Sequence, residues 1–129
     1  MMANDGQNNG IGKPCIAFEL ADPKEAYDHL NYELVEDYGD YAYGHYLHTW
    51  DDGHRFLARC RGCGGYILIQ CSEYHSFTDA PDGYYTDWFP VKTPEEADIL
   101  NQKFDGFAIE REFESRYLME TNGKLSWSR

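Results

Sequence analysis

Apolar and polar residues alternate along the middle of the chain, which is the pattern of a β-strand with two distinct faces. In the stretch 66–72, Ile67, Ile69 and Cys71 fall on one face, and the residues between them fall on the other. Runs of this kind predict strands over residues 42–50, 54–61, 64–73 and 84–90. Joined by turns, these strands form an antiparallel meander.

Three further segments have weaker strand patterns. Asn122-Gly123 is a strong two-residue hairpin signal, and it predicts strands over 118–121 and 124–127. The segment 15–20 predicts a short strand near the N-terminus. Phe107, Ile109 and Phe113 alternate loosely, which is consistent with one more strand.

The chain contains two helix starts. Asp22 as N-cap and Pro23 at the first helical position predict a helix that runs to Tyr38 and ends at Gly39. Its apolar residues recur at helical spacing and predict a buried stripe of Tyr27, Leu30, Leu34 and Tyr38.

The second helix start is the capping-box pattern from Thr93 to Glu96. Ala97, Leu100 and Phe104 form its apolar stripe, and we expect Gly106 to end it.

Together these elements predict an α+β fold: an antiparallel β-meander sheet of about five to seven strands, with two helices packed on it. At 129 residues the chain is large enough for one domain with a single core. We expect that domain to span residues 15–129, after a flexible N-terminal tail over 1–14 that is rich in Asn and Gly.

The turn between the two central strands, residues 60–65, reads Cys-Arg-Gly-Cys-Gly-Gly. A metal knuckle needs two thiolates directed at one point, and glycines let the backbone N–H groups turn toward the sulfurs. Over about six residues this turn resembles the zinc knuckle of zinc-ribbon and rubredoxin-like domains. The resemblance implies a structural zinc on Cys60 and Cys63, although a second Cys-x-x-Cys is missing. A glycine-rich turn with two free thiols is the main alternative, and a redox pair is a third.

Candidates for the remaining zinc ligands follow from strand pairing. If the strand 42–50 pairs with the strand 54–61 about the turn Asp51-Asp52-Gly53, residue 45 lies opposite residue 59. His45 then lies beside the knuckle, and Cys15 can reach it from the N-terminal segment. Cys71 alternates with two isoleucines and is more typical of a core thiol.

The net charge is −12, and it disfavours direct binding to nucleic acid or to an anionic membrane. An acidic surface suits a protein partner with a basic surface. The candidate partner-binding residues are the acids of the first helix and two aromatics of the segment 74–83: Asp28, Glu36, Asp37, Tyr74 and Phe77. The sequence contains no apolar run of membrane-spanning length, and we expect a cytoplasmic protein.

These features favour a non-enzymatic protein that binds another protein, of the inhibitor or immunity type. One version is an anti-CRISPR-like mimic of nucleic acid that blocks a nucleic-acid-binding effector.

Two alternatives remain. The first is a small metal-dependent hydrolase that uses the far end of the central hairpin: His48, Asp51, Asp52, His54 and His75. The second is a zinc-ribbon-like module that contacts nucleic acid through Arg55, Arg59 and Arg61.

Overall fold

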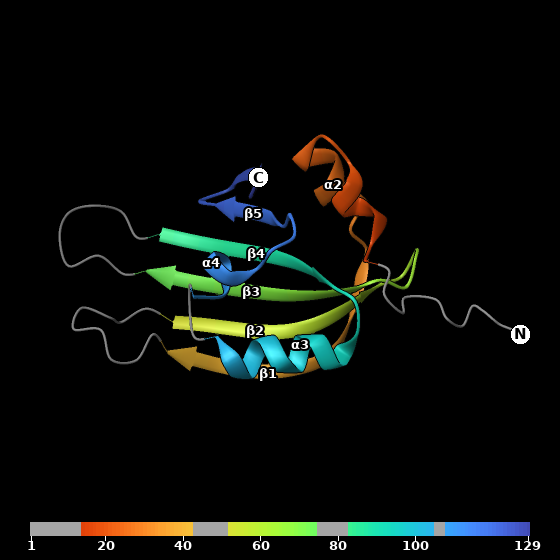
Figure 1. Ribbon diagram of the computed structural model, residues 1–129. Coiled ribbons are helices and arrows are strands. Elements are labelled where there is room, and N and C mark those ends of the chain that lie inside the picture. The colour runs from red at the N-terminus through yellow and green to blue at the C-terminus, as the bar shows by residue number, and fades with distance from the viewer. Residues whose placement is uncertain (1–13, 43–51, 75–82, 105–107) are drawn as a thin grey trace, which may run out of the picture.

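A six-stranded antiparallel sheet, with its strands in the order of the sequence, is the frame of the molecule (Figure 1). The computed structural model describes residues 14–42, 52–74, 83–104 and 108–129, with the backbone alone at 40–42, 52 and 74. The strands are β1 (Tyr32–Ala42), β2 (Asp52–Cys60), β3 (Tyr66–Tyr74), β4 (Gly83–Val91), β5 (Leu118–Thr121) and β6 (Lys124–Trp127). The predicted α+β meander is confirmed.

Helices lie on both faces of this sheet. They are the 3₁₀ helix η1 (Ile16–Glu19) and the α-helices α2 (Pro23–His29), α3 (Pro94–Lys103) and α4 (Ala108–Glu112). Among the described residues, no helix combines the length and the apolar character needed to cross a membrane.

Local signals located α3 and the last hairpin correctly. Thr93 Oγ1 accepts a hydrogen bond from the Glu96 N–H at 3.1 Å, which is the predicted N-cap. The last hairpin turns at Asn122 and Gly123, which have positive φ angles of 50° and 87°. Two consecutive residues with positive φ are the signature of a type I′ turn, whose twist matches that of the strands.

The predicted helix from Pro23 to Tyr38 is wrong, because α2 ends at His29. Leu30 is already extended, and from Tyr32 the chain pairs with β2, with Tyr32 opposite Cys60. Tyrosine and valine favour strands, and a ladder of cross-strand hydrogen bonds outweighs the helical spacing. Leu34, expected in a buried stripe, is 62% exposed.

The two short strands predicted over 15–20 and around 107–113 are helical instead. In η1 the Phe18 N–H bonds to the Cys15 carbonyl, a three-residue step that places both side chains on one side. In α4 the Phe113 N–H bonds to the Ile109 carbonyl, and this four-residue spacing buries both side chains on one helix face. The predicted strand over 42–50 and the tail over 1–14 lie outside the described residues, except for Ala42 and Pro14.

Alternation along the central strands separates two cores, one on each face. The first lies beneath η1 and α2 and contains Cys15, Ala17, Phe18, Ala26, Ala58, Cys60, Ile67, Ile69, Trp88 and Leu118. The second lies beneath α3 and α4 and contains Leu57, Leu68, Phe89, Val91, Ala97, Ile109, Phe113 and Tyr117. Both faces of β3 are therefore buried along much of its length.

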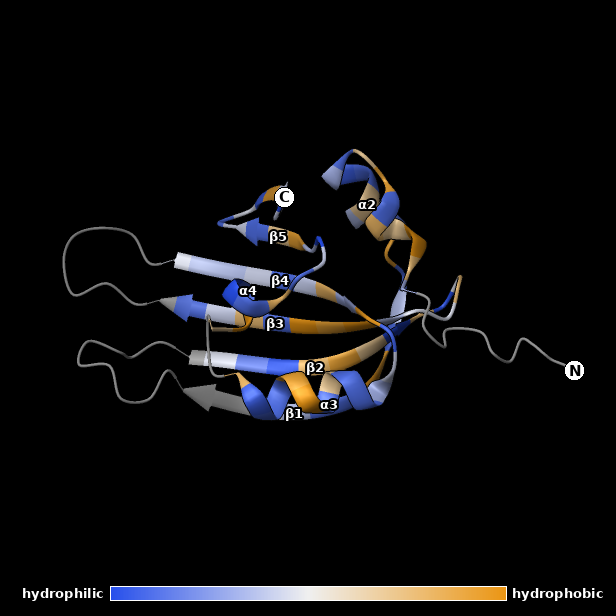
Figure 2. Cartoon of the chain, viewed as in Figure 1, coloured by the Kyte–Doolittle hydropathy of each residue, from blue (hydrophilic) through white to orange (hydrophobic). Residues whose placement is uncertain are grey.

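The two ends of the sheet differ in character. Apolar residues gather in the half of β2, β3 and β4 nearer the 60–65 turn, and polar residues occupy the other half (Figure 2). On the face of α3 and α4, the row Leu57–Leu68–Phe89 is followed by the row Arg55–Gln70–Asp87. Arg55, Gln70 and Asp87 are each at most 2% exposed.

The charged groups of this buried row, Arg55 and Asp87, are stabilised in different ways. The Arg55 guanidinium donates from Nε to Gln70 Oε1 at 2.7 Å and from Nη1 to the Asn101 carbonyl at 3.2 Å. Asp87 is buried near Glu110 of α4, and burial, followed by the interaction with this neighbouring carboxylate, raises the pKa of Asp87 to about 9. Asp87 therefore keeps its proton at neutral pH.

We predict that Asp87→Asn stabilises the protein, and more so as pH rises. Between pH 4 and pH 9 the folded state holds a proton at Asp87 that the unfolded chain, with its usual pKa of 3.8, has lost, so stability falls through this window. Asparagine replaces the protonated carboxyl and removes that dependence. At about 1.4 kcal/mol per pH unit, urea titrations should show a gain at pH 8 that exceeds the gain at pH 5 by up to about 4 kcal/mol. An equal gain at both pH values, or a loss at pH 8, would contradict the assignment; Asp28→Asn on the surface is the control.

Candidate metal centre

The 60–65 turn connects β2 to β3 and is closed by the backbone. The Cys60 N–H donates to the Gly65 carbonyl at 2.8 Å, and the Gly64 N–H donates to the Cys60 carbonyl at 2.9 Å. Gly64 has a φ of +80°, a conformation that glycine adopts without strain. The turn is also fixed from outside, because the Arg61 N–H donates to the Asn31 carbonyl at 2.7 Å.

Cys15 reaches this turn because Gly65 has no side chain. A Cβ atom at position 65 would lie 2.5 Å from the Cys15 nitrogen and 2.7 Å from its Cα. The segment after Cys15 is held independently: Arg116 donates to the Phe18 and Leu20 carbonyls at 2.7 and 2.6 Å. Backbone packing and hydrogen bonds therefore hold Cys15 next to the turn.

The result is a cluster of three thiols. The Sγ atoms of Cys15, Cys60 and Cys63 all lie within 4.8 Å of one another. Cys15 and Cys60 are buried, and Cys63 is partly exposed. Sulfurs bound tetrahedrally to a zinc ion lie about 3.8 Å apart, given Zn–S bonds of about 2.3 Å. The cluster can hold a metal ion with only small side-chain movements.

The electrostatics of the cluster set Cys60 apart. Burial acts to raise the pKa of the Cys60 thiol, but hydrogen bonds from the N–H groups of Cys63 and Gly62 and from the neighbouring thiols lower it below its ordinary value. Hydrogen bonds of this kind are what a knuckle supplies to a thiolate. Burial raises the pKa of the Cys15 thiol instead. Cys15 therefore needs a cation at the cluster before it loses its proton.

Of the predicted ligands, the structure brings together Cys60, Cys63 and Cys15. The prediction of His45 as a ligand relied on residue 45 lying opposite residue 59. That pairing is wrong, because Glu33 lies opposite Arg59. His45 itself lies outside the described residues. Within the described part of the chain, no fourth His, Cys, Asp or Glu joins the cluster.

The three arginines of the nucleic-acid alternative do not form one surface. Arg55 is 2% exposed and bonded within the core, so its predicted contact role is wrong. Arg59 lies over the Tyr66 ring at 5.8 Å from its centroid. Arg61 lies 3.5 Å from the Glu33 carboxylate. Arginines 59 and 61 are exposed beside the cysteine turn.

The residues of the hydrolase alternative are described only in part. His54 Nε2 lies 2.7 Å from Asp37 Oδ1, and it lines a cleft at the polar end of the sheet. Asp52 begins β2. The other three residues, His48, Asp51 and His75, lie outside the described ranges. Within those ranges, the cysteines are the only cluster of metal-ligand type.

The predicted partner-binding residues do not share a helix face. Asp28 lies on α2, where Lys24 Nζ binds its carboxylate at 2.9 Å, whereas Glu36 and Asp37 lie in β1. Tyr74 is the last residue of β3, and Phe77 lies outside the described residues. The expected acidic helix is replaced by an acidic strand at the edge of the sheet.

Sequence reasoning also missed the residues that share the cleft with His54, which include Thr86 and Glu120. The signal available was the pairing of the last hairpin with the strand 84–90, which sets Thr86 opposite Glu120. No motif links these positions along the chain.

We predict that Gly65→Ala separates Cys15 from the other two cysteines. The added methyl overlaps the Cys15 backbone, so the N-terminal segment has to move. Titration with zinc against a competing chelator should show an affinity at least about tenfold weaker. Gly62→Ala is the matched control, since its Cβ would meet only Cys60 Sγ at 3.8 Å. Equal affinities of the two variants would mean that Cys15 is not a ligand.

We also predict that Cys60→Ser abolishes metal binding and lowers the melting temperature by at least about 5 °C, because folding and metal binding are coupled. Metal content by mass spectrometry and calorimetric melting check this. Cys71→Ser, which changes a thiol outside the cluster, should keep its metal. If the Cys60→Ser protein melts and binds metal like the wild type, the three cysteines are packed together without forming a metal site.

Comparisons with protein-family models, with curated proteins and with solved structures found no match for this chain. A fold class does not specify an activity. The cysteine cluster, the acidic edge and the clefts are therefore the features from which function can be inferred.

Proposed function

We propose that this is a non-enzymatic protein that binds a protein partner with a basic surface, in the manner of an inhibitor or immunity protein. We further propose that a structural zinc at Cys15, Cys60 and Cys63 fastens its N-terminal segment. The observation that carries the binding proposal is the outer edge of β1, where exposed apolar side chains are surrounded by carboxylates.

β1 is the first strand of the sheet, so within the described structure only β2 pairs with it. Its register with β2 shifts between Leu34 and Glu36, a bulge around Val35. Leu34 is 62% and Val35 48% exposed. Large apolar side chains exposed next to each other are a feature of contact surfaces rather than of ordinary solvated strands.

Carboxylates flank this apolar pair. Glu33, Glu36 and Asp37 are all exposed. An apolar centre within a charged rim is the anatomy of a protein–protein interface. With a net charge of −12 over the chain, the complementary partner is basic. A nucleic-acid-binding protein is one such partner, as an anti-CRISPR-like mimic would require.

The zinc proposal rests on the donor set. Three cysteines that converge on one point favour a soft, tetrahedral ion, and zinc is the common choice where no redox chemistry is needed. Cys15 and Cys60 are buried in the first core, next to residues that hold the fold. A metal there stabilises the docking of the N-terminal segment.

We predict that Leu34→Ser and Glu36→Lys each weaken partner capture at least about tenfold. Tagged wild-type protein should retain one stoichiometric partner from nuclease-treated host lysate, less at high salt. Ile99→Ser is the matched control, because Ile99 is 60% exposed on α3 and lies outside the edge. Equal retention by all variants would exclude the β1 edge, and no retained protein at any salt would overturn the binding function.

A further inference from the structure

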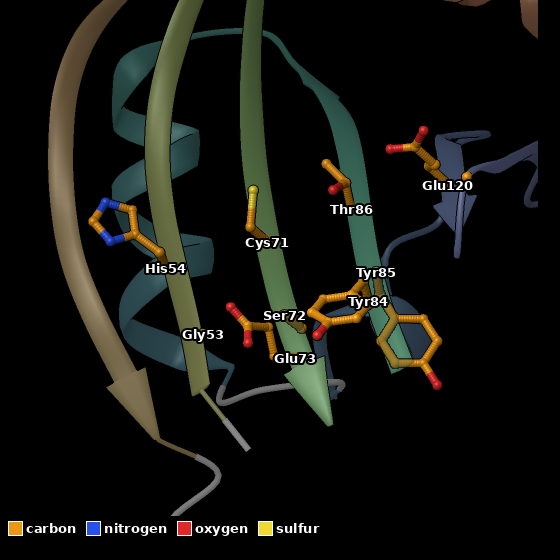
Figure 3. A pocket seen from close by; sticks show the side chains of 10 residues that line it. Gly53, His54, Cys71, Ser72, Glu73, Tyr84, Tyr85, Thr86 and Glu120 are labelled. Atoms are coloured by element: carbon orange, nitrogen blue, oxygen red, sulfur yellow. The ribbon is translucent and has the colours of Figure 1, made fainter. Parts of the chain in front are cut away.

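Among the described residues, the face of the sheet beneath η1 and α2 is covered at one end and lines a cleft at the other. The covered row runs Phe56–Ile69–Trp88–Leu118 across β2 to β5, and the next row runs His54–Cys71–Thr86–Glu120. The side chains of this second row lie side by side across the four strands (Figure 3). They line a cleft of about 590 Å³. Binding sites for small groups usually enclose about 300 to 1,000 Å³.

The chemistry of the cleft is that of a cation site. Glu73 and Glu120 line it from β3 and β5. His54, the histidine among its described lining residues, is held by the Asp37 carboxylate. Burial raises the pKa of the Cys71 thiol, so this thiol adds no charge at neutral pH.

Tyr84 adds an aromatic surface. It also lines the cleft, stands opposite Glu73 across β3 and β4, and is 53% exposed. A planar guanidinium can stack on such a ring while it donates two parallel hydrogen bonds to a carboxylate. An ammonium group lacks the planar fork that stacks on a ring and donates in parallel, so the combination of tyrosine and glutamates favours arginine over lysine.

We infer that the cleft over His54, Cys71, Thr86 and Glu120 accepts an arginine side chain of the basic partner. This inference rests on the proposed function and deepens it: the β1 edge supplies the apolar contact, and the cleft supplies selectivity for arginine. His54 connects the two surfaces, because it lines the cleft and pairs with Asp37 of β1.

The test is a titration of isotope-labelled full-length protein with acetyl-arginine methylamide, followed by NMR. We expect saturable shifts of the Cys71, Thr86 and Glu120 amides, weaker binding of the lysine analogue and none of the norleucine analogue. Glu120→Gln should weaken arginine binding about fivefold, as expected for the loss of one exposed charge pair. Glu112→Gln, on the exposed surface of α4, should change nothing. Absence of saturable shifts, or equal shifts with norleucine, would overturn the inference.

Partner capture separates this inference from the function on which it rests. A partner retained by wild type and lost with Glu120→Gln supports the cleft as an arginine site. A partner retained equally by both overturns the cleft and leaves the β1 edge intact. Tight binding of spermidine without an effect of Glu120→Gln on capture would identify a small polyamine ligand instead, and would also overturn the inference.

Discussion

The close contact between the N-terminal segment and the 60–65 turn is the constraint on which much of the structure depends. Gly65 lets the Cys15 backbone approach within a distance that no side chain permits. That approach seats Phe18 against Trp127 and completes the first core. It also gathers the three thiols. The fold and the candidate metal centre therefore share one cause, and a metal ion would reinforce a contact that packing already makes.

The polar end of the sheet is organised differently on its two faces. Beneath α3 and α4, Arg55, Gln70 and Asp87 are buried, and Arg55 bonds to Gln70 and to Asn101 of α3; the electrostatic cost of this burial appears in the raised pKa of Asp87. On the opposite face, the row from His54 to Glu120 is partly exposed within the described structure and lines a cleft. One face uses polar residues to fix the covering helices, and on the other face they line the cleft.

Predictions succeeded where the signal is local and failed where it depends on distant partners. Thr93 caps α3 and Asn122-Gly123 turns the last hairpin through bonds within a few residues, which sequence alone can specify. The apolar residues from Tyr32 to Tyr38 have helical spacing, yet this segment pairs with β2. The reason is that cross-strand hydrogen bonds stabilise the strand more than a helix extended beyond α2 would be stabilised by its own hydrogen bonds. The alternation predicts Phe113 in a strand, yet its N–H bonds to the Ile109 carbonyl just after the end of α4.

The sequence by itself determined the meander, the cysteine turn and the acidic character, because alternation, glycine placement and charge are properties of the chain in order. Only the tertiary structure decided which residues meet. It placed Glu33 rather than His45 opposite Arg59, buried Arg55, and set Glu120 beside Thr86. The physical reason is the register of the strands. Backbone hydrogen bonds are similar in every register, so the register is fixed by which side chains pack against the rest of the fold.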